Sequence, residues 1–180
     1  MSSERTPQQE RLAAIVRRFP HRKIVVVGDL VADQFLYGEI TRVSREAPVL
    51  ILRYERTVTT PGGAANCATN LAALDARAVL IGVVGQDEAG AGLLDKLGAG
   101  HVDCRSIISS PVQRTTTKVR ILAGQIHSTR QQVIRIDYEA EPLSDESVRE
   151  QLRARLREEA RMKLRQGWSK RIGGSSSASR

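Results

Sequence analysis

Two adjacent glycines, Gly62 and Gly63, constrain the fold of this chain more than any other feature. They stand directly before Ala64–Leu74, a run of small and aliphatic residues with helical spacing. Glycines at a helix entrance permit backbone angles that other residues avoid, and they let a ligand approach main-chain N–H groups. Asn66 in the first turn adds a donor and an acceptor, the mixture that sugar hydroxyls need. A structural turn before a core helix explains the segment equally well.

Strand and helix patterns alternate around this segment and predict an α/β fold. The β-branched run Lys23–Val27 predicts a buried parallel strand, and Ala78–Val84 predicts a second one. Glu88–Leu97 has helical spacing, and the glycines just beyond it predict a left-handed cap at Gly98 or Gly100. Such alternation is typical of a mainly parallel sheet flanked by helices.

Two further regions predict strands of a different kind. Residues 34–60 alternate apolar with charged side chains around Pro48, a pattern typical of half-exposed strands. Thr115–Leu122 and Gln132–Ile136 predict a hairpin. The parallel sheet is therefore expected to carry extra strands from 34–60 and 115–137.

The two ends of the chain differ from its middle. Helical spacing over Gln8–Phe19 predicts an N-terminal helical extension over residues 1–22, ahead of an α/β domain over residues 23–160. A further helix is predicted to start at Ser144. Residues 161–180 are basic and end in glycines and serines, so we predict a disordered tail there.

The formal net charge of +8 is concentrated near the C-terminus. Residues 1–148 hold 18 Lys and Arg against 17 Asp and Glu, a balance of +1, while residues 149–180 hold 10 against 3, a balance of +7. The body of the protein is nearly neutral, and aromatic residues make up only 3% of the chain, which leaves few platforms for base stacking. We therefore do not expect nucleic-acid binding to be the main role.

The sequence contains no apolar run long enough to cross a bilayer and no signal-like stretch at its start, so a cytoplasmic location without membrane contact is expected. Cys67 is predicted on the apolar face of the helix after the glycines, and Cys104 follows a turn at residues 100–101. Neither belongs to a CxxC pair or a histidine cluster. Both are therefore expected to be reduced thiols, and no metal site is predicted.

Asp29 and Asp33 follow the first predicted strand, at the carboxyl end where ligands bind in open α/β sheets. A carboxylate there can accept hydrogen bonds from sugar hydroxyls. For Asp33 we favour the ligand role, whereas an Asx turn or a helix cap explains Asp29 slightly better. Gly62, Gly63 and Asn66 are predicted to face the same ligand from the next strand-to-helix boundary.

Three segments in this order, Gly28–Asp33, Gly62–Asn66 and Gly85–Gly90, resemble the N-terminal half of the ribokinase-like (PfkB) carbohydrate kinases. Within that family, Gly38-Glu39, Arg42–Val49 and Thr115–Arg120 most resemble the heptose 7-phosphate kinase domains of bifunctional ADP-heptose synthesis proteins. The resemblance runs from about Lys23 to Leu156. It implies a partial ribokinase-like parallel sheet with a small β-strand lid.

The resemblance also implies a reaction and a site. The reaction is the ATP- and magnesium-dependent phosphorylation of heptose 7-phosphate at its anomeric hydroxyl, on the route to lipopolysaccharide core. The implied sugar site is made by Asp33, Gly62, Gly63 and Asn66, under a lid formed by the strands within 34–60 and 115–137. Lids of this kind also pair two subunits, so the resemblance suggests a lid-mediated homodimer.

Four cations are candidates to neutralise the phosphate of such a sugar, because guanidinium and ammonium groups complement its charge. They are Arg42, Arg45, Lys118 and Arg130. A solvated surface charge or a lid salt bridge is the alternative role for each of them, and the role that we favour.

The chain departs from the family pattern in one respect. The family carries its nucleotide site and catalytic aspartate in a C-terminal Gly-Ala-Gly-Asp segment, and no such segment occurs in this sequence. No catalytic residue is therefore predicted, and ATP and magnesium binding by this chain is not expected. The change in composition after Ala160 is typical of a truncated or frame-shifted product, with a natural short variant as the alternative. We expect sugar-side binding with little or no turnover.

Two alternatives to this function stay open. Within the same family, the acceptor could instead be fructose, ribose or a nucleoside. In a different class, the chain is a non-catalytic module, either a sugar-binding scaffold that dimerises through its lid or a polyanion binder that uses its basic tail.

Overall fold

The computed structural model describes residues 6–125, 129–140, 143 and 145–172. The chain divides into two compact units, Met1–Pro142 and Leu143–Arg180. None of the described helices combines the length and the apolar character that a membrane span requires.

The first unit contains a parallel three-stranded sheet, called the core sheet below, with strand order β1-β4-β5. Its strands are β1 (Lys23–Val27), β4 (Arg77–Gly85) and β5 (Ile107–Ser110). Helices α2 (Ala64–Ala73) and α3 (Glu88–Ala99) pack against β4. The predicted α/β fold is confirmed, as are the two strands and two helices predicted around the glycines. The first strand was predicted to be buried, but β1 is only partly buried and Val27 at its end is 54% exposed. β5 was not predicted, because four residues that include two serines carry no clear strand pattern.

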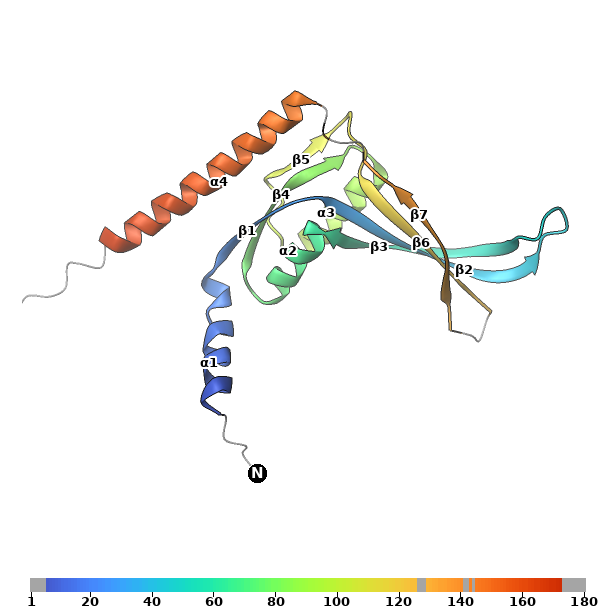
Figure 1. Cartoon of the computed structure of the whole chain (residues 1–180), viewed down its shortest axis with the longest axis horizontal. Helices are drawn as coiled ribbons and strands as arrows, with labels where there is room; N and C mark the ends of the chain where they lie inside the picture. The colour runs from blue at the N-terminus through green and yellow to red at the C-terminus, as the bar shows by residue number, and fades with distance from the viewer. Residues whose placement is uncertain (1–5, 126–128, 141–142, 144, 173–180) are drawn as a thin grey trace, which may run out of the picture. The chain divides into compact units, whose positions relative to one another are not determined.

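A second sheet, called the lid sheet below, has four strands in the order β3-β2-β6-β7 (Figure 1). They are β2 (Leu30–Val43), β3 (Leu50–Gly63), β6 (Thr116–Gly124) and β7 (Gln131–Tyr138). β2 runs parallel to β6, whereas the β2–β3 and β6–β7 pairs are antiparallel. The predicted hairpin within 115–137 is confirmed, and the strands predicted in 34–60 extend beyond both limits, to Leu30 and Gly63.

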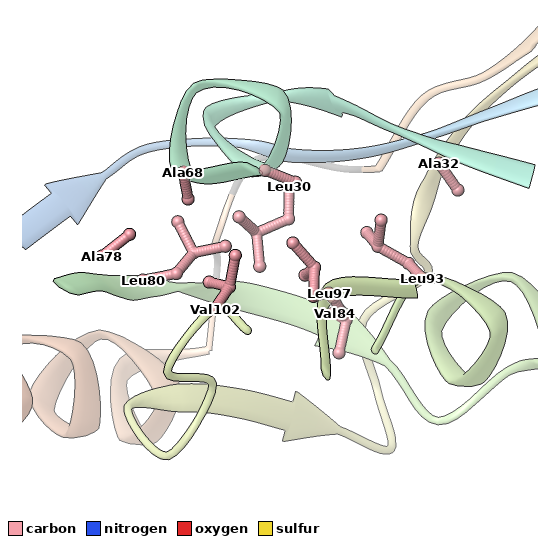
Figure 2. Close-up of a cluster of buried hydrophobic side chains, with 10 residues drawn as sticks. Leu30, Ala32, Ala68, Ala78, Leu80, Val84, Leu93, Leu97 and Val102 are labelled. Atoms are coloured by element: carbon pink, nitrogen blue, oxygen red, sulfur yellow. The ribbon is translucent and has the colours of Figure 1, made fainter. Parts of the chain in front are cut away.

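The hydrophobic core lies between the helices and the two sheets, where Leu80, Leu93 and Leu97 are fully buried (Figure 2). β2 contributes Leu30 and Ala32, which are 3% and 0% exposed. Successive side chains of a strand point to opposite faces, so Asp33 points away from the side that Leu30 and Ala32 bury. The first residues of β2 therefore join the core to the lid sheet and turn a carboxylate away from the core.

The described residues include a helix towards each end of the chain. In the first unit, α1 (Pro7–Val16) begins with a capping box in which the Thr6 side chain accepts from the Gln9 N–H and the Gln9 side chain accepts from the Thr6 N–H. A short 3-10 helix, η1 (Phe19–His21), precedes β1. Residues 1–5 of the predicted extension lie outside the described residues.

The second unit contains α4 (Glu146–Ile172). The Asp145 side chain accepts a hydrogen bond from the Ser147 N–H at 2.8 Å, close to the predicted helix start. The structure differs from the prediction of a disordered tail, because residues 161–172 continue the helix; they include the strong helix formers Arg, Lys, Met, Leu and Gln and no proline. Residues 173–180 of that tail lie outside the described residues.

Two local predictions need correction. The residue with left-handed backbone after α3 is His101, with φ 59°, whereas Gly100 has φ −84°. Cys67 is exposed, because its position on α2 faces away from the buried Ala65 and Ala68. Cys104 is partly buried, and burial raises the pKa of its thiol.

Candidate sugar site

The glycine entrance of α2 has the unusual backbone that the sequence predicted. Gly63 is the N-cap residue and has φ 57°, in the region that L side chains rarely adopt. A Cβ at this position would lie 2.6 Å from the Asp29 carbonyl oxygen, so there is no room for a side chain. The same carbonyl accepts a hydrogen bond from the Ala64 N–H at 3.0 Å. This bond ties the end of β3 and the start of α2 to the segment that joins β1 to β2.

The Asp33 carboxylate lies at the meeting point of three lid strands. Its Oδ1 accepts a hydrogen bond from Arg120 Nη1 on β6 at 2.5 Å. Its Oδ2 lies against Gly62 on β3, where a Cβ would approach that oxygen to 2.5 Å. A side chain at position 62 would have to displace the carboxylate, so glycine there preserves its position. The Asp33 and Arg120 side chains are 22% and 23% exposed, so the pair is shielded and still accessible from solvent.

The remaining predicted sugar residues are exposed. Asp29 precedes β2, and its backbone carbonyl makes the contact described above. Asn66 lies in the first turn of α2, where its side-chain oxygen accepts a long hydrogen bond from Asn70 Nδ2 at 3.4 Å. The structure therefore joins Asp33 to Gly62, and Asp29 to Gly63 and Ala64, along the boundary between the lid sheet and α2.

The four candidate phosphate cations lie in different places. Lys118 on β6 is half-buried and stands in register with Asp33 on β2. Arg130 donates to the Glu55 carboxylate at 2.5 and 2.6 Å, which is the lid salt bridge that the sequence analysis favoured. Arg42 and Arg45 are exposed at the far end of the β2–β3 hairpin, and Arg42 lies about 30 Å from Asp33 along the strand, at about 3.3 Å per residue.

A second carboxylate fixes the base of β6. Asp87 Oδ1 accepts from the Gly90 N–H at 2.8 Å and from the Thr115 hydroxyl at 2.7 Å, and Oδ2 accepts from the Thr115 N–H at 2.9 Å. The Thr115 hydroxyl in turn accepts from the Gly85 N–H at 2.8 Å. Burial raises the pKa of Asp87, but the hydrogen bonds from Thr115 and Gly90 outweigh it and hold that pKa below its usual value. This cluster attaches the start of β6 to the N-terminus of α3.

Sequence reasoning missed Arg120 as a site residue. The strand pattern placed it in one strand of a predicted hairpin, but the pairing of β6 with β2 is a long-range contact that no local signal reveals. One sequence signal could have identified Arg120 as a candidate. It lies two residues from Lys118 and therefore on the same face of β6. The described residues contain no group of three or more His, Cys, Asp or Glu side chains that could hold a metal ion, so no residue is assigned to magnesium.

The comparison with protein families covers most of the chain. A family model for the pfkB family carbohydrate kinases matches residues 21–158. The chain belongs to the pfkB carbohydrate kinase family.

Curated relatives narrow the comparison. The bifunctional protein HldE of Caulobacter vibrioides is 41% identical over 130 residues, which cover 72% of this chain and 26% of that protein. The bifunctional protein HldE of Gluconobacter oxydans is 42% identical over 144 residues, which cover 79% of this chain and 28% of that protein. The chain thus spans little more than a quarter of the length of these relatives.

A solved structure shows the same fold. The carbohydrate kinase from Agrobacterium tumefaciens superimposes with a TM-score of 0.50 at 22% sequence identity, and the match covers 65% of this chain and 35% of that one. At this identity the likeness concerns the fold alone.

Proposed function

We propose that this chain forms the sugar-binding part of a carbohydrate kinase domain whose acceptor is heptose 7-phosphate. The position of Asp33 carries the proposal: its partly exposed carboxylate lies against the Gly62 backbone, next to the entrance of α2. A carboxylate held at such a place can accept hydrogen bonds from sugar hydroxyls. The relatives named HldE support a heptose-related acceptor over fructose, ribose or a nucleoside.

The proposed reaction is transfer of a phosphoryl group from ATP to the anomeric hydroxyl of the bound sugar, in the cytoplasm. Positioning and charge neutralisation account for most of the catalysis of such transfers. The residues of this chain contribute the acceptor side, because Asp33 orients the sugar and glycine at position 62 lets the carboxylate lie beside the entrance of α2. Since the Gly-Ala-Gly-Asp segment is not among the 180 residues, we expect binding of the acceptor without turnover by this chain.

Among the four candidate cations, Lys118 is the one that we propose as a contact to the sugar phosphate. It is half-buried and in register with Asp33, so its ammonium group is carried on the face of the sheet that bears the carboxylate. Lys118→Ala should weaken binding of a phosphorylated sugar, whereas Arg45→Ala at the hairpin end should not. Equal affinities in calorimetry for the wild-type chain and Lys118→Ala would reject this contact.

Calorimetric titration with heptose 7-phosphate tests the acceptor site. Asp33→Asn should weaken binding at least tenfold, because a charge-assisted hydrogen bond contributes about 1.5–3 kcal/mol and 1.4 kcal/mol corresponds to about a factor of ten. Asp95→Asn is the control, since Asp95 is an exposed carboxylate on α3 and is not part of the proposed site. If fructose, ribose or a nucleoside binds more tightly than heptose 7-phosphate, the proposed acceptor is wrong, although the family assignment stands.

A coupled ATPase assay with heptose 7-phosphate tests the expectation of binding without turnover. The purified chain should consume no ATP above the rate measured without sugar. Robust turnover that depends on the sugar would contradict the expectation and would require a catalytic base within the 180 residues.

We also propose a homodimer formed through the lid sheet. Ile134 and Ile136 on β7 are 54% and 41% exposed and lie on one face, opposite Ile121 and Val119 of β6. A second copy of the lid sheet would cover this apolar face. Ile134→Glu should convert a dimer to a monomer in sedimentation velocity, and Val133→Glu on the opposite face of β7 is the control. A monomeric wild-type chain would exclude the dimer.

A further inference from the structure

Arg120 is an arginine of the lid sheet that the proposed contacts to sugar and phosphate do not use. Its side chain is 23% exposed, less than the other ion-paired arginines of the described lid strands, whose exposed fractions are 50% for Arg135, 57% for Arg56 and 67% for Arg53. An ion pair of ordinary surface exposure contributes little to stability. The Arg120–Asp33 pair is more buried than these surface pairs and lies at the proposed sugar site, so we consider a role for Arg120 in sugar binding.

Three contacts fix the Asp33 carboxylate and Arg120 relative to each other. Arg120 Nη1 donates to Oδ1, while Oδ2 occupies the space that a Cβ on Gly62 would need. The guanidinium group is itself held by Phe35, the in-register neighbour of Arg120 on β2, with 5.3 Å between the Arg120 Cζ atom and the ring centroid. The carboxylate is thus confined on one side by a cation and on the other by backbone.

We propose that Arg120 is a positioning residue that orients the Asp33 carboxylate to accept hydrogen bonds from the sugar. The inference rests on the proposed sugar site and adds the residue that sets its geometry. A carboxylate offers about four acceptor sites, and Arg120 occupies one of them, so hydroxyl groups can use the others. Without the guanidinium group the carboxylate can rotate about its side-chain bonds, and sugar binding then has to fix that rotation.

The proposed role of Arg120 also predicts which sugars lose affinity when it is replaced. A residue that acts through Asp33 affects the hydroxyl contacts, so it should matter equally for heptose and heptose 7-phosphate. A residue that touches the phosphate would matter only for the phosphorylated sugar. The two roles are therefore separated by comparing the same variant with both ligands.

A double-mutant cycle on the full 180-residue chain tests the proposal, with heptose 7-phosphate and heptose as calorimetric ligands. Arg120→Gln should weaken binding of both sugars by about tenfold, the effect of losing one charge-assisted hydrogen bond. In the Asp33→Asn background the same substitution should cause no further loss, because its effect passes through the carboxylate. Arg135→Gln is the matched control, since Arg135 pairs in register with Arg120 on the neighbouring strand and should leave both affinities unchanged.

Thermal unfolding without ligand shows whether each variant is folded, and Arg120→Lys replaces Arg120→Gln if the latter is not. The lysine keeps the charge but lacks the planar fork, so it should restore only part of the affinity. Independent, multiplying effects of the Asp33 and Arg120 substitutions would overturn the proposal, as would a loss confined to the phosphorylated sugar. Unchanged affinity in Arg120→Gln overturns the positioning role alone, whereas no sugar binding by the wild-type chain overturns the proposed function with it.

Discussion

The core sheet and the lid sheet are built from similar strand-forming residues, but different contacts cover them. β4 of the core sheet has Leu80 and Ile81 at 0% exposure, whereas every residue of β7 in the lid sheet is exposed. Helices α2 and α3 pack against the core sheet and also contact β2 and β3 of the lid sheet, whereas β7 at the lid edge is held by strand pairing, and ion pairs and cation–π contacts cross the lid strands. Asp33 lies where one sheet passes into the other, so a rigid core holds the start of a strand whose far end is solvated.

The largest expected effect comes from comparing a buried residue of the core sheet with an exposed residue of the lid sheet. Leu80→Ala should lower the free energy of unfolding by about 2–5 kcal/mol, because it removes buried methyl groups and leaves a cavity. Val133→Ala on β7, where the side chain is 45% exposed, should change it by less than about 0.5 kcal/mol. Chemical denaturation measures both values. Similar losses from the two substitutions would show that the lid sheet is packed as well as the core.

The attachment of β6 to α3 provides the second test. Asp87→Ala should destabilise the chain by about 1–3 kcal/mol, because it removes the cap of α3 and leaves the Thr115 N–H without its carboxylate partner. Asp95→Ala on the exposed side of α3 is the control for loss of a carboxylate. Hydrogen exchange of the β6 amides is a second measurement, because exchange in the Asp87→Ala variant should be faster in β6 and in the rest of the lid sheet. Unchanged exchange in β6 would show that the stability of the lid sheet does not depend on its attachment to α3.

The third test measures how the stability contributed by Asp103, which lies beside β4 of the core sheet, depends on pH. A hydrogen bond from the Arg105 side chain, opposed by burial, lowers the pKa of Asp103 from 3.8 to about 2. Because the folded pKa lies below the unfolded one, the stabilising contribution of Asp103 is present above about pH 4 and is lost as the pH falls towards 2. The difference in stability between wild type and Asp103→Asn should therefore shrink over this range. A difference that is independent of pH would contradict the assignment.

The smallest effect is expected within the lid sheet itself. Arg130→Gln breaks the pair with Glu55, in which the side chains are 34% and 29% exposed, and should cost about 0.2–1 kcal/mol. Denaturation in low and in high salt checks the origin of this value, because salt screens exposed charges. A loss that persists in about 1 M salt, where the Debye length is about 3 Å, would point to packing by the arginine stem instead.

The contrast between the sheets also explains what the sequence could predict. The run Lys23–Val27 and the helices after Gly63 and Asp87 carry apolar side chains with regular spacing, and the structure confirms these elements, although β1 is only partly buried. Asp33 and Gly62 could be named as candidates because strand ends and glycine pairs are local signals. Their contact with Arg120 depends on which strand lies beside β2, and that follows from the whole fold.

Composition misled the prediction at two positions. The charged residues after Ala160 suggested disorder, although arginine and lysine have high helix propensity and α4 continues to Ile172. Cys67 sits among alanines and leucines in the sequence, but its angular position on α2 leaves it exposed. In both places the composition of the segment was a poor guide to the structure and exposure of its individual residues.

β2 is paired with β6 from Val31 to Glu39, so only the part of the β2–β3 hairpin beyond Glu39 is a two-stranded arm. From Glu39 to Val43 this arm measures roughly 13 Å at about 3.3 Å per residue. A bend of about 15° at Glu39 would carry its tip roughly 3–4 Å, while Asp33, which is paired on both sides, would keep its place. The outer end of the hairpin could thus travel to meet other molecules without changing the geometry of the sugar carboxylate.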